Sequence, residues 1–239
     1  MARAKNKEAT VGSQNRTVTP NEAKSALEHC IKLQRPIMMW GAPGIGKSDI
    51  VKQVADAQKR EVIDIRLPLW EPTDIKGIPY YNSKENNMVW AAPAELPTSA
   101  DSTAIVFLDE LNSAAPAVQA AAYQLILNRR VGQYKLPDGV SIVAAGNRDN
   151  DKGVTYRMPA PLANRFVHIE LRVDYDDWLQ WATDQKIHAD VVGYCTFAKQ
   201  DLYDFDPRGS SRSFATPRSW SFVSQLLSDD LPESTLTDL

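Results

Sequence analysis

The run GAPGIGKS at residues 41–48 constrains this chain more than any other feature. It fits the pattern GxxxxGK(S/T), and it lies between a short apolar run at residues 37–40 and a segment whose apolar residues recur at helical spacing. Glycines there let consecutive backbone amides face a row of phosphates, and the helix N-terminus adds partial positive charge. An ordinary glycine turn is the alternative, and the position between a strand and a helix argues against it. The candidate phosphate-binding residues are Gly41, Ala42, Pro43, Gly44, Ile45, Gly46, Lys47 and Ser48.

Two acidic residues, Asp109 and Glu110, follow a second apolar run. Open parallel sheets bind ligands at the carboxyl ends of their strands, which is where this pair would lie. We expect Lys47 to contact the phosphates, and Ser48 and Asp109 to hold Mg²⁺. Glu110 is expected to act as the general base on an attacking water. The alternative is that Asp109 caps a turn and Glu110 is merely solvated, which leaves the coincidence with the phosphate loop unexplained.

Short apolar runs alternate with helical patterns over the first 173 residues, which predicts a parallel sheet covered by helices on both faces. Thr19 and Pro20 are expected to start the first helix, which ends before Pro36. From Asp174 onward the strands cease. The expected strands are residues 37–40, 62–67, 104–108, 140–145 and 167–171, and further expected helices are residues 114–128, 174–184, 188–203 and 216–228. The chain thus divides into a flexible arm (1–16), an α/β core (17–173) and a small helical domain (174–239).

The composition of the 239 residues excludes several classes of protein. Hydrophobic residues make up 43% and charged residues 24%, which excludes a collagen-like, coiled-coil or wholly disordered chain. There is no run of about 18 apolar residues, and no apolar stretch follows the basic residues near the N-terminus, so we expect a cytoplasmic protein that does not involve a membrane. The net charge of −3 does not favour nucleic acid as a partner, although a local basic patch would leave that role open.

With these motifs placed, the chain resembles the AAA+ ATPases, and within them the MoxR-like group of the helix-two-insert clade. The run AGNR at residues 145–148 is similar to the sensor-one segment, which implies that Asn147 orients the attacking water. Residues 161–166, PLANRF, resemble the segment that carries the arginine finger offered to a neighbouring subunit, which implies that role for Arg165. Residues 216–220, TPRSW, are similar to the sensor-two motif, which makes Arg218 the residue that contacts the γ-phosphate.

Each of these residues has a simpler interpretation. Asn147 lies in a turn-rich run, where asparagine is common for backbone reasons. Arg165 could pair with a surface acid, and Arg218 could simply start a helix, although arginine in a first turn opposes the helix dipole. Three further arginines compete with Arg165 for the role of the finger: Arg129, Arg130 and Arg148.

The resemblance covers about residues 17–228 and implies an AAA+ core, that is, a P-loop NTPase fold, with a small helical lid. Residues of about 68–98 correspond to the helix-two insert, and residues 130–139 to a hairpin before sensor one. Two features depart from the family. Ser113 stands where an arginine often follows the acidic motif, and the lid ends early, which indicates a lid that is either cut short or naturally reduced. The inserts hold aromatic residues and prolines that we expect to be exposed to a partner: Trp70, Pro72, Tyr80, Tyr81, Trp90, Tyr134 and Pro137.

The resemblance implies Mg²⁺-dependent hydrolysis of ATP by a homo-hexameric ring that remodels or activates a protein partner, such as a von Willebrand A-domain protein. ATP and Mg²⁺ are the expected cofactors. Two alternatives stay open: a nucleic-acid motor or nuclease-activating ATPase of the same clade, and a stand-alone P-loop kinase that acts without a ring.

Overall fold

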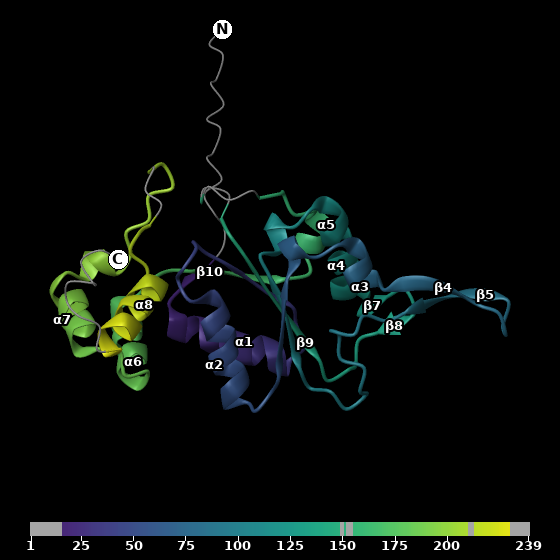
Figure 1. The fold of residues 1–239 in the computed structure, drawn as a ribbon, viewed down its shortest axis with the longest axis horizontal. Helices are drawn as coiled ribbons and strands as arrows, with labels where there is room; N and C mark the ends of the chain where they lie inside the picture. The colour runs from purple at the N-terminus through teal and green to yellow at the C-terminus, as the bar shows by residue number, and fades with distance from the viewer. Residues whose placement is uncertain (1–15, 149–150, 152–154, 210–212, 230–239) are drawn as a thin grey trace, which may run out of the picture.

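A computed structural model describes residues 16–148, 151, 155–209 and 213–229. Its centre is a six-stranded parallel sheet in the order β1-β10-β2-β9-β6-β3, which confirms the predicted α/β fold of a P-loop NTPase (Figure 1). The strands are β1 (Arg16–Val18), β2 (Ile37–Trp40), β3 (Val62–Arg66), β6 (Ile105–Asp109), β9 (Ser141–Gly146) and β10 (Val167–Leu171). Residues 1–15 of the expected arm lie outside the described part of the chain. Arg16, the last residue of that expected arm, is the first residue of the edge strand β1.

Both faces of the sheet are buried. Successive side chains of a strand point to opposite sides, so neighbouring residues pack into different core clusters. Met39 belongs to the core cluster formed with α1 (Pro20–Lys32) and α2 (Lys47–Ala57). Its neighbour Met38 belongs to the cluster formed with α3 (Pro72–Lys76) and α4 (Pro116–Asn128). Both methionines are fully buried. The near-continuous apolar strands of the sequence therefore follow from burial on two sides, as in other parallel sheets.

The first helix starts where the sequence predicts. Thr19 is the N-cap of α1, its hydroxyl accepts a hydrogen bond from the Glu22 amide, and the Glu22 carboxylate accepts one from the Thr19 amide. Pro20 occupies the first turn, where its missing amide hydrogen costs no helical bond. Together these contacts fix the position of α1 directly after β1.

The first insert forms α3 and an antiparallel hairpin of β4 (Ile78–Asn82) and β5 (Asn87–Ala91), which projects from the body of the molecule (Figure 1). Tyr80 and Tyr81 are 52% and 65% exposed, as expected. The second insert pairs β7 (Arg130–Val131) with β8 (Tyr134–Lys135). Here the expected exposure is wrong, because Tyr134 is only 9% exposed and its hydroxyl donates to the Pro97 carbonyl at 2.7 Å.

The other expected surface residues of the inserts differ in exposure. Trp70, Pro72 and Trp90 are half-buried, and Pro137 is buried, which corrects the expectation for that residue as well. Of these insert residues, the exposed ones are thus Tyr80 and Tyr81 of the projecting hairpin, and the shorter β7–β8 pair packs onto the core.

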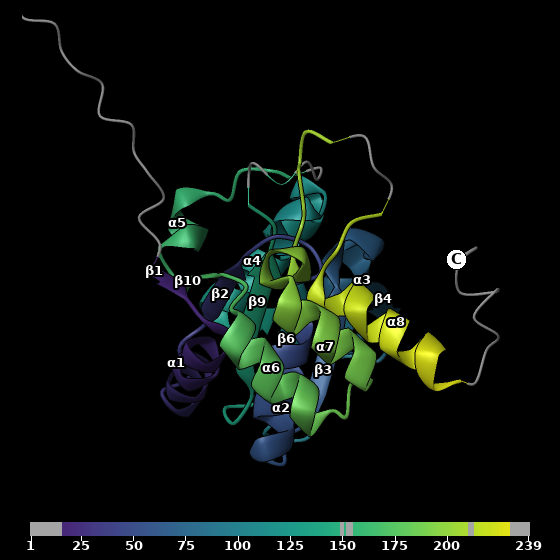
Figure 2. The same ribbon diagram turned by 90° about the vertical axis from the view of Figure 1, so that its left-hand side faces the viewer.

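Three helices follow the sheet and share a core cluster of their own: α6 (Tyr175–Asp184), α7 (Ala189–Phe197) and α8 (Pro217–Ser228). Figure 2 shows them together on one side of the molecule, in front of the sheet. The predicted helix over 188–203 is interrupted at Ala198, after which residues Lys199–Leu202 form the short 3-10 helix η3. Asp177 of α6 accepts hydrogen bonds from the Asn21 amide at 2.8 Å and from its side chain at 2.9 Å, which joins this unit to α1.

The possible incompleteness of the lid concerns residues 230–239, which lie outside the described residues. Within the described ranges, no helix is both long and apolar enough to cross a membrane.

Candidate nucleotide-binding site

The phosphate loop leaves the end of β2 and enters α2 at Lys47. Gly44 and Gly46 have φ angles of +77° and +90°, a region that glycine adopts without the steric cost of a Cβ atom. A Cβ on Gly44 would also come within 2.8 Å of the Thr216 hydroxyl oxygen. The two glycines therefore allow both the turn of the loop and the close approach of the C-terminal helical unit.

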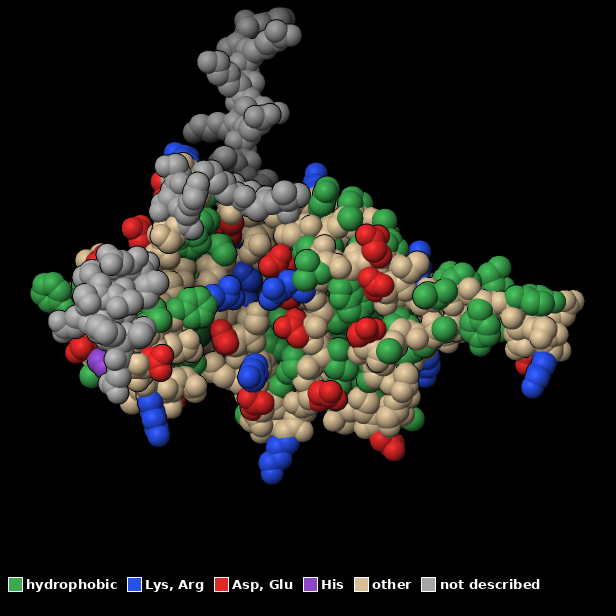
Figure 3. All heavy atoms as spheres, viewed as in Figure 1, with side chains coloured by type: hydrophobic (Ala, Val, Ile, Leu, Met, Phe, Trp, Pro, Cys, Tyr) green, Lys and Arg blue, Asp and Glu red, His purple; other side chains and the backbone are tan. Residues whose placement is uncertain are grey.

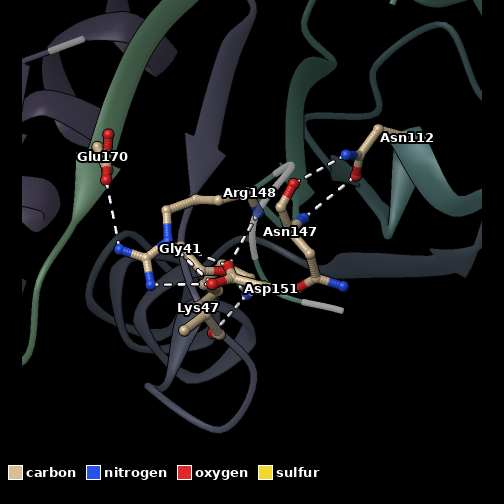
Figure 4. A network of polar contacts seen from close by, with 8 residues as sticks. Gly41, Lys47, Asn112, Asn147, Arg148, Asp151 and Glu170 are labelled. Carbon is tan, nitrogen blue, oxygen red and sulfur yellow. Dashed lines mark hydrogen bonds and ion pairs between the residues drawn. The ribbon is translucent and has the colours of Figure 1, made fainter. Parts of the chain in front are cut away.

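Lys47 is held inside this loop, and it is only 9% exposed. Its Nζ donates to the carbonyls of Gly41 at 2.7 Å and Ala42 at 2.9 Å, and to Asn147 Oδ1 at 3.3 Å (Figure 4). Burial lowers the pKa of Lys47 to about 8, against the opposing attraction of Asp109. Burial thus removes part of the hydration of the ammonium group. A phosphate bound in the loop would replace that hydration with its own negative oxygens.

The predicted metal-binding residues lie next to each other. Ser48 Oγ donates to Asp109 Oδ2 at 3.4 Å, and Asp109 is 6% exposed at the end of β6. A hydroxyl and a carboxylate are the hard oxygen donors that Mg²⁺ prefers, so this donor set fits the expected ion. The other carboxylate oxygen, Oδ1, accepts the Glu110 amide at 2.9 Å, so the turn-capping alternative describes a real contact of Asp109 as well.

Glu110 has a left-handed backbone, with a φ angle of 55°. A residue with a side chain pays a conformational cost there of about 1–2 kcal/mol. This conformation turns the chain sharply after β6 and leads into the short 3-10 helix η2 (Leu111–Ser113). Strained residues of this kind gather at functional sites, which agrees with the role expected for Glu110.

Asn147 follows the last residue of β9, and its side chain reaches Lys47. Its backbone is fixed on both sides by Asn112, which is 1% exposed: Asn112 Oδ1 accepts the Asn147 amide at 3.1 Å, and Asn112 Nδ2 donates to the Asn147 carbonyl at 2.8 Å (Figure 4). Gly146 makes room for this contact, because a Cβ there would lie 2.5 Å from Asn112 Oδ1.

Sequence reasoning gave Asn112 no role. The only available signal was its place two residues after the acidic pair, and a pattern of letters does not reveal which backbone an amide will contact.

Two of the arginines that compete with Arg165 are engaged elsewhere. Arg148 forms ion pairs with Asp151 at 3.0 Å and Glu170 at 3.4 Å (Figure 4). The hydrogen bond that Arg148 donates to the Asp151 carboxylate is the main reason that the pKa of Arg148 is raised. Arg129 donates to the carbonyls of Pro137 at 2.6 Å and Val140 at 2.8 Å. Both guanidinium groups are thus engaged within this chain.

Arg165 lies apart from this cluster, in the turn after the short helix α5 (Ala160–Ala163). Its side chain is exposed, and the described part of the chain provides no ion-pair partner for it. Arg130 is exposed as well. Of the four candidate arginines, these two are therefore the exposed ones without an ion-pair partner in the described part of the chain.

Arg218 does belong to the cluster. It lies in the first turn of α8, its amide donates to the Gly44 carbonyl at 3.3 Å, and its charge contributes to the lowered pKa of Lys47. Figure 3, viewed as in Figure 1, shows Lys and Arg side chains next to Asp and Glu side chains near the middle of this face of the molecule.

A hollow beside the phosphate loop opens between the sheet domain and the helical unit. Its apolar lining includes Ile45 and Ile50 from the loop and α2, and Trp178 and Trp181 from α6. Lys24 and Asp174 add polar groups to the lining. A flat apolar ring system with polar edges fits such a lining, which is the chemistry of a nucleobase next to its phosphates.

The parallel sheet, the glycine loop at a helix N-terminus and the acidic pair at the end of the neighbouring strand define the class of P-loop nucleotide-binding proteins. Within this class, residues 36–166 match the AAA domain of the dynein-related subfamily, and the chain belongs to that family.

Individual proteins resemble this chain in sequence or in fold. Midasin of Giardia intestinalis is 28% identical over 174 residues, which cover 67% of this chain and 4% of midasin. A RuvB variant of Thermotoga maritima superimposes with a TM-score of 0.53 at 16% identity, over 92% of this chain and 64% of RuvB. NtrX of Brucella abortus gives a TM-score of 0.53 at 13% identity, over 89% of this chain and 50% of NtrX.

The chain therefore spans a small fraction of midasin and about half to two thirds of the two solved structures. At these identities the structural likeness concerns the fold alone. The family supports nucleotide binding and ATPase activity in general terms, and the narrower resemblance to the MoxR-like group stays a prediction.

Proposed function

We propose that this chain is the Mg²⁺-dependent ATP-hydrolysing subunit of an AAA+ ring, similar to MoxR-like ATPases, and that the ring remodels or activates a protein partner. One observation carries the proposal. The groups that would bind ATP gather around Lys47, whereas Arg165 is exposed on a separate turn with no ion-pair partner among the described residues. A stand-alone kinase has no need of such an arginine, and a ring gives it a site in the neighbouring subunit.

Each residue then has a defined task. Lys47 and the loop amides bind the phosphates, and Ser48 and Asp109 hold the metal ion, which when bound neutralises developing charge on the phosphates. Glu110 takes a proton from the attacking water, while Asn147 orients that water. Arg218 contacts the phosphates from the lid of the same subunit. Arg165 reaches the nucleotide site of the neighbouring subunit.

We also propose that residues 17–173 act as the core and residues 174–239 as the lid. The separate core cluster of α6–α8 supports this division. The Gly44–Arg218 contact, which joins the second part to the phosphate loop, supports its role as a lid. The base would bind in the hollow between the two parts, against Trp178 and Trp181.

Glu110→Gln should bind ATP and Mg²⁺, but its rate of ATP turnover should fall by a factor of about 10² to 10⁴. The amide keeps the shape of the side chain and cannot accept a proton. Size-exclusion chromatography with ATP and Mg²⁺ should show this variant as a stable ring. Asp109→Asn should instead raise the Mg²⁺ concentration needed for activity.

Two outcomes would contradict the proposal. Hydrolysis by Glu110→Gln at the parent rate would remove this residue from the role of base. A parent protein that stays monomeric with ATP and Mg²⁺ while it is fully active would favour the stand-alone kinase.

Deleting residues 80–88 should spare basal ATPase activity and ring formation and abolish stimulation by a protein partner. The deletion removes the end of the β4–β5 hairpin, where Tyr81 and Met88 are 65% and 64% exposed, and such a patch is typical of a partner surface. The probe is the product of the reading frame next to this gene, with a von Willebrand A-domain protein expected. Phe197→Ser, which removes a 91% exposed aromatic ring from α7, is the matched control.

The same assay includes DNA and RNA. Strong activation by nucleic acid that the deletion removes would overturn the protein-remodelling proposal and favour the motor alternative.

A further inference from the structure

His168 of β10 connects two segments that the proposed function keeps separate. Trp40 Nε1 donates to His168 Nδ1 at 2.8 Å, and His168 Nε2 lies 2.7 Å from the Ala163 carbonyl oxygen. The planes of the Trp40 and His168 rings are nearly parallel, with 11° between them and 6.0 Å between the ring centroids. The imidazole thus bridges the last residue of β2 and the last residue of α5.

These contacts select one tautomer of the ring. The indole of Trp40 is a donor only, so His168 Nδ1 must offer its lone pair. Nε2 then carries the hydrogen and donates it to Ala163. Phe166, which is 8% exposed, approaches the imidazole edge-on at 6.1 Å between ring centroids and shields the bridge. One neutral tautomer therefore satisfies both partners.

The two ends of the bridge lead to functional segments. Trp40 is followed directly by Gly41, the first residue of the phosphate loop. Ala163 lies two residues before Arg165, and the turn closes through the bond from the Arg165 amide to the Leu162 carbonyl at 3.0 Å. The Ala163 carbonyl also accepts the Phe166 amide at 3.2 Å. Leu162 and Phe166 pack this segment into the core, and the bond from His168 adds a polar contact that ties its backbone to the strand beside β2.

We propose that His168 is a positioning residue: it holds the turn that carries Arg165 in register with the strand that enters the phosphate loop. This inference rests on the proposed function, because Arg165 must act in the neighbouring subunit for its position to matter there. A helix of four residues has too few internal bonds to hold such a turn alone. Trp40 serves the same purpose by fixing the tautomer and orientation of the imidazole.

His168→Leu should lower turnover about tenfold and change the affinity for ATP less than twofold, because the loss falls on the arginine offered to the neighbour and not on the subunit's own phosphate loop. Trp40→Phe should give a smaller loss of the same kind, and combining it with His168→Leu should add little. Turnover of the assembled ring and isothermal titration with a non-hydrolysable ATP analogue measure the two quantities.

The decisive measurement mixes subunits. A His168→Leu subunit keeps its own Glu110, and a Glu110→Gln subunit keeps a well-held Arg165. Mixed rings should therefore regain activity at sites that receive the intact arginine next to an intact base. Arg165→Ala mixed with Glu110→Gln is the positive control. His29→Leu, which changes an exposed histidine on α1, should behave like the parent protein.

His168→Gln separates positioning from folding. Its amide offers one acceptor and one donor, so it should recover much of the turnover lost in His168→Leu, and thermal unfolding of both variants checks that the fold persists. A His168→Leu protein that loses affinity for ATP, or that Glu110→Gln does not rescue while Arg165→Ala is rescued, overturns the positioning role alone. If Arg165→Ala keeps the parent turnover, the proposed finger fails and the positioning role fails with it.

Discussion

Lys47→Ala should weaken ATP binding by about 100-fold or more, since charge-assisted hydrogen bonds to phosphate are lost at about 1.5–3 kcal/mol each. The buried Nζ already bonds two loop carbonyls and Asn147 Oδ1, so no nearby side chain can take its place without moving. Isothermal titration with a non-hydrolysable analogue measures the loss. Lys52→Ala, an exposed lysine farther along α2, is the matched control. Unchanged affinity in Lys47→Ala would remove the loop from the mechanism.

The same titration should depend on pH. Because burial lowers the pKa of Lys47 to about 8, the free protein loses this proton as the pH rises through 8, and ATP affinity should fall there. Lys47→Ala should lack that step. The effect on folding has the opposite sign. Between pH 8 and the ordinary value of 10.5 the unfolded chain binds more protons at this residue, so the free energy of unfolding should rise with pH across this window.

Arg165→Ala should bind ATP normally and lose about 10³-fold or more in turnover, because an arginine finger acts on charge that develops in the transition state. The exposed position of Arg165 on the turn after α5 leaves it free to meet a neighbour's nucleotide. Mixing Arg165→Ala with Glu110→Gln subunits should restore part of the activity. Fluorescence energy transfer between labelled subunits confirms that the two populations mix.

Arg130→Ala tests the competing candidate, since Arg130 is also exposed. If that variant loses turnover and is rescued by Glu110→Gln, while Arg165→Ala is active, the finger is Arg130. A mixture of Arg165→Ala and Glu110→Gln that exchanges subunits and stays inactive would show that Arg165 does not act across an interface.

The sheet and the phosphate loop could be predicted because their signals are local. An apolar run, a glycine pattern and a helical repeat each identify one element, and the carboxyl ends of parallel strands then bring Ser48 and Asp109 together without further information. The capping residues Thr19 and Pro20 located the start of α1 for the same reason.

Features that depend on distant contacts could not be predicted. Tyr134 looked exposed because its hydrogen-bond acceptor, Pro97, lies in the other insert. Arg148 looked available because Glu170, one of its partners, comes from another strand. The two hydrogen bonds between the Asn112 side chain and the Asn147 backbone likewise join residues that are 35 positions apart. In each case a pattern of residue types gave the chemistry of the side chain but not its partner.

The contact between Gly44 and the start of α8 attaches the helical unit to the phosphate loop at one end of α8. The N-terminal end of α8 contacts the loop through the hydrogen bond from the Arg218 amide to the Gly44 carbonyl. Asn21 and Asp177 hold the same unit to α1. The 12 residues of α8 extend about 18 Å from the loop, so a tilt of roughly 10° there displaces the far end by about 3 Å. A tilt of that size about the Arg218–Gly44 contact would displace the outer end of α8 by about the size of a side chain while the phosphate loop stays in place.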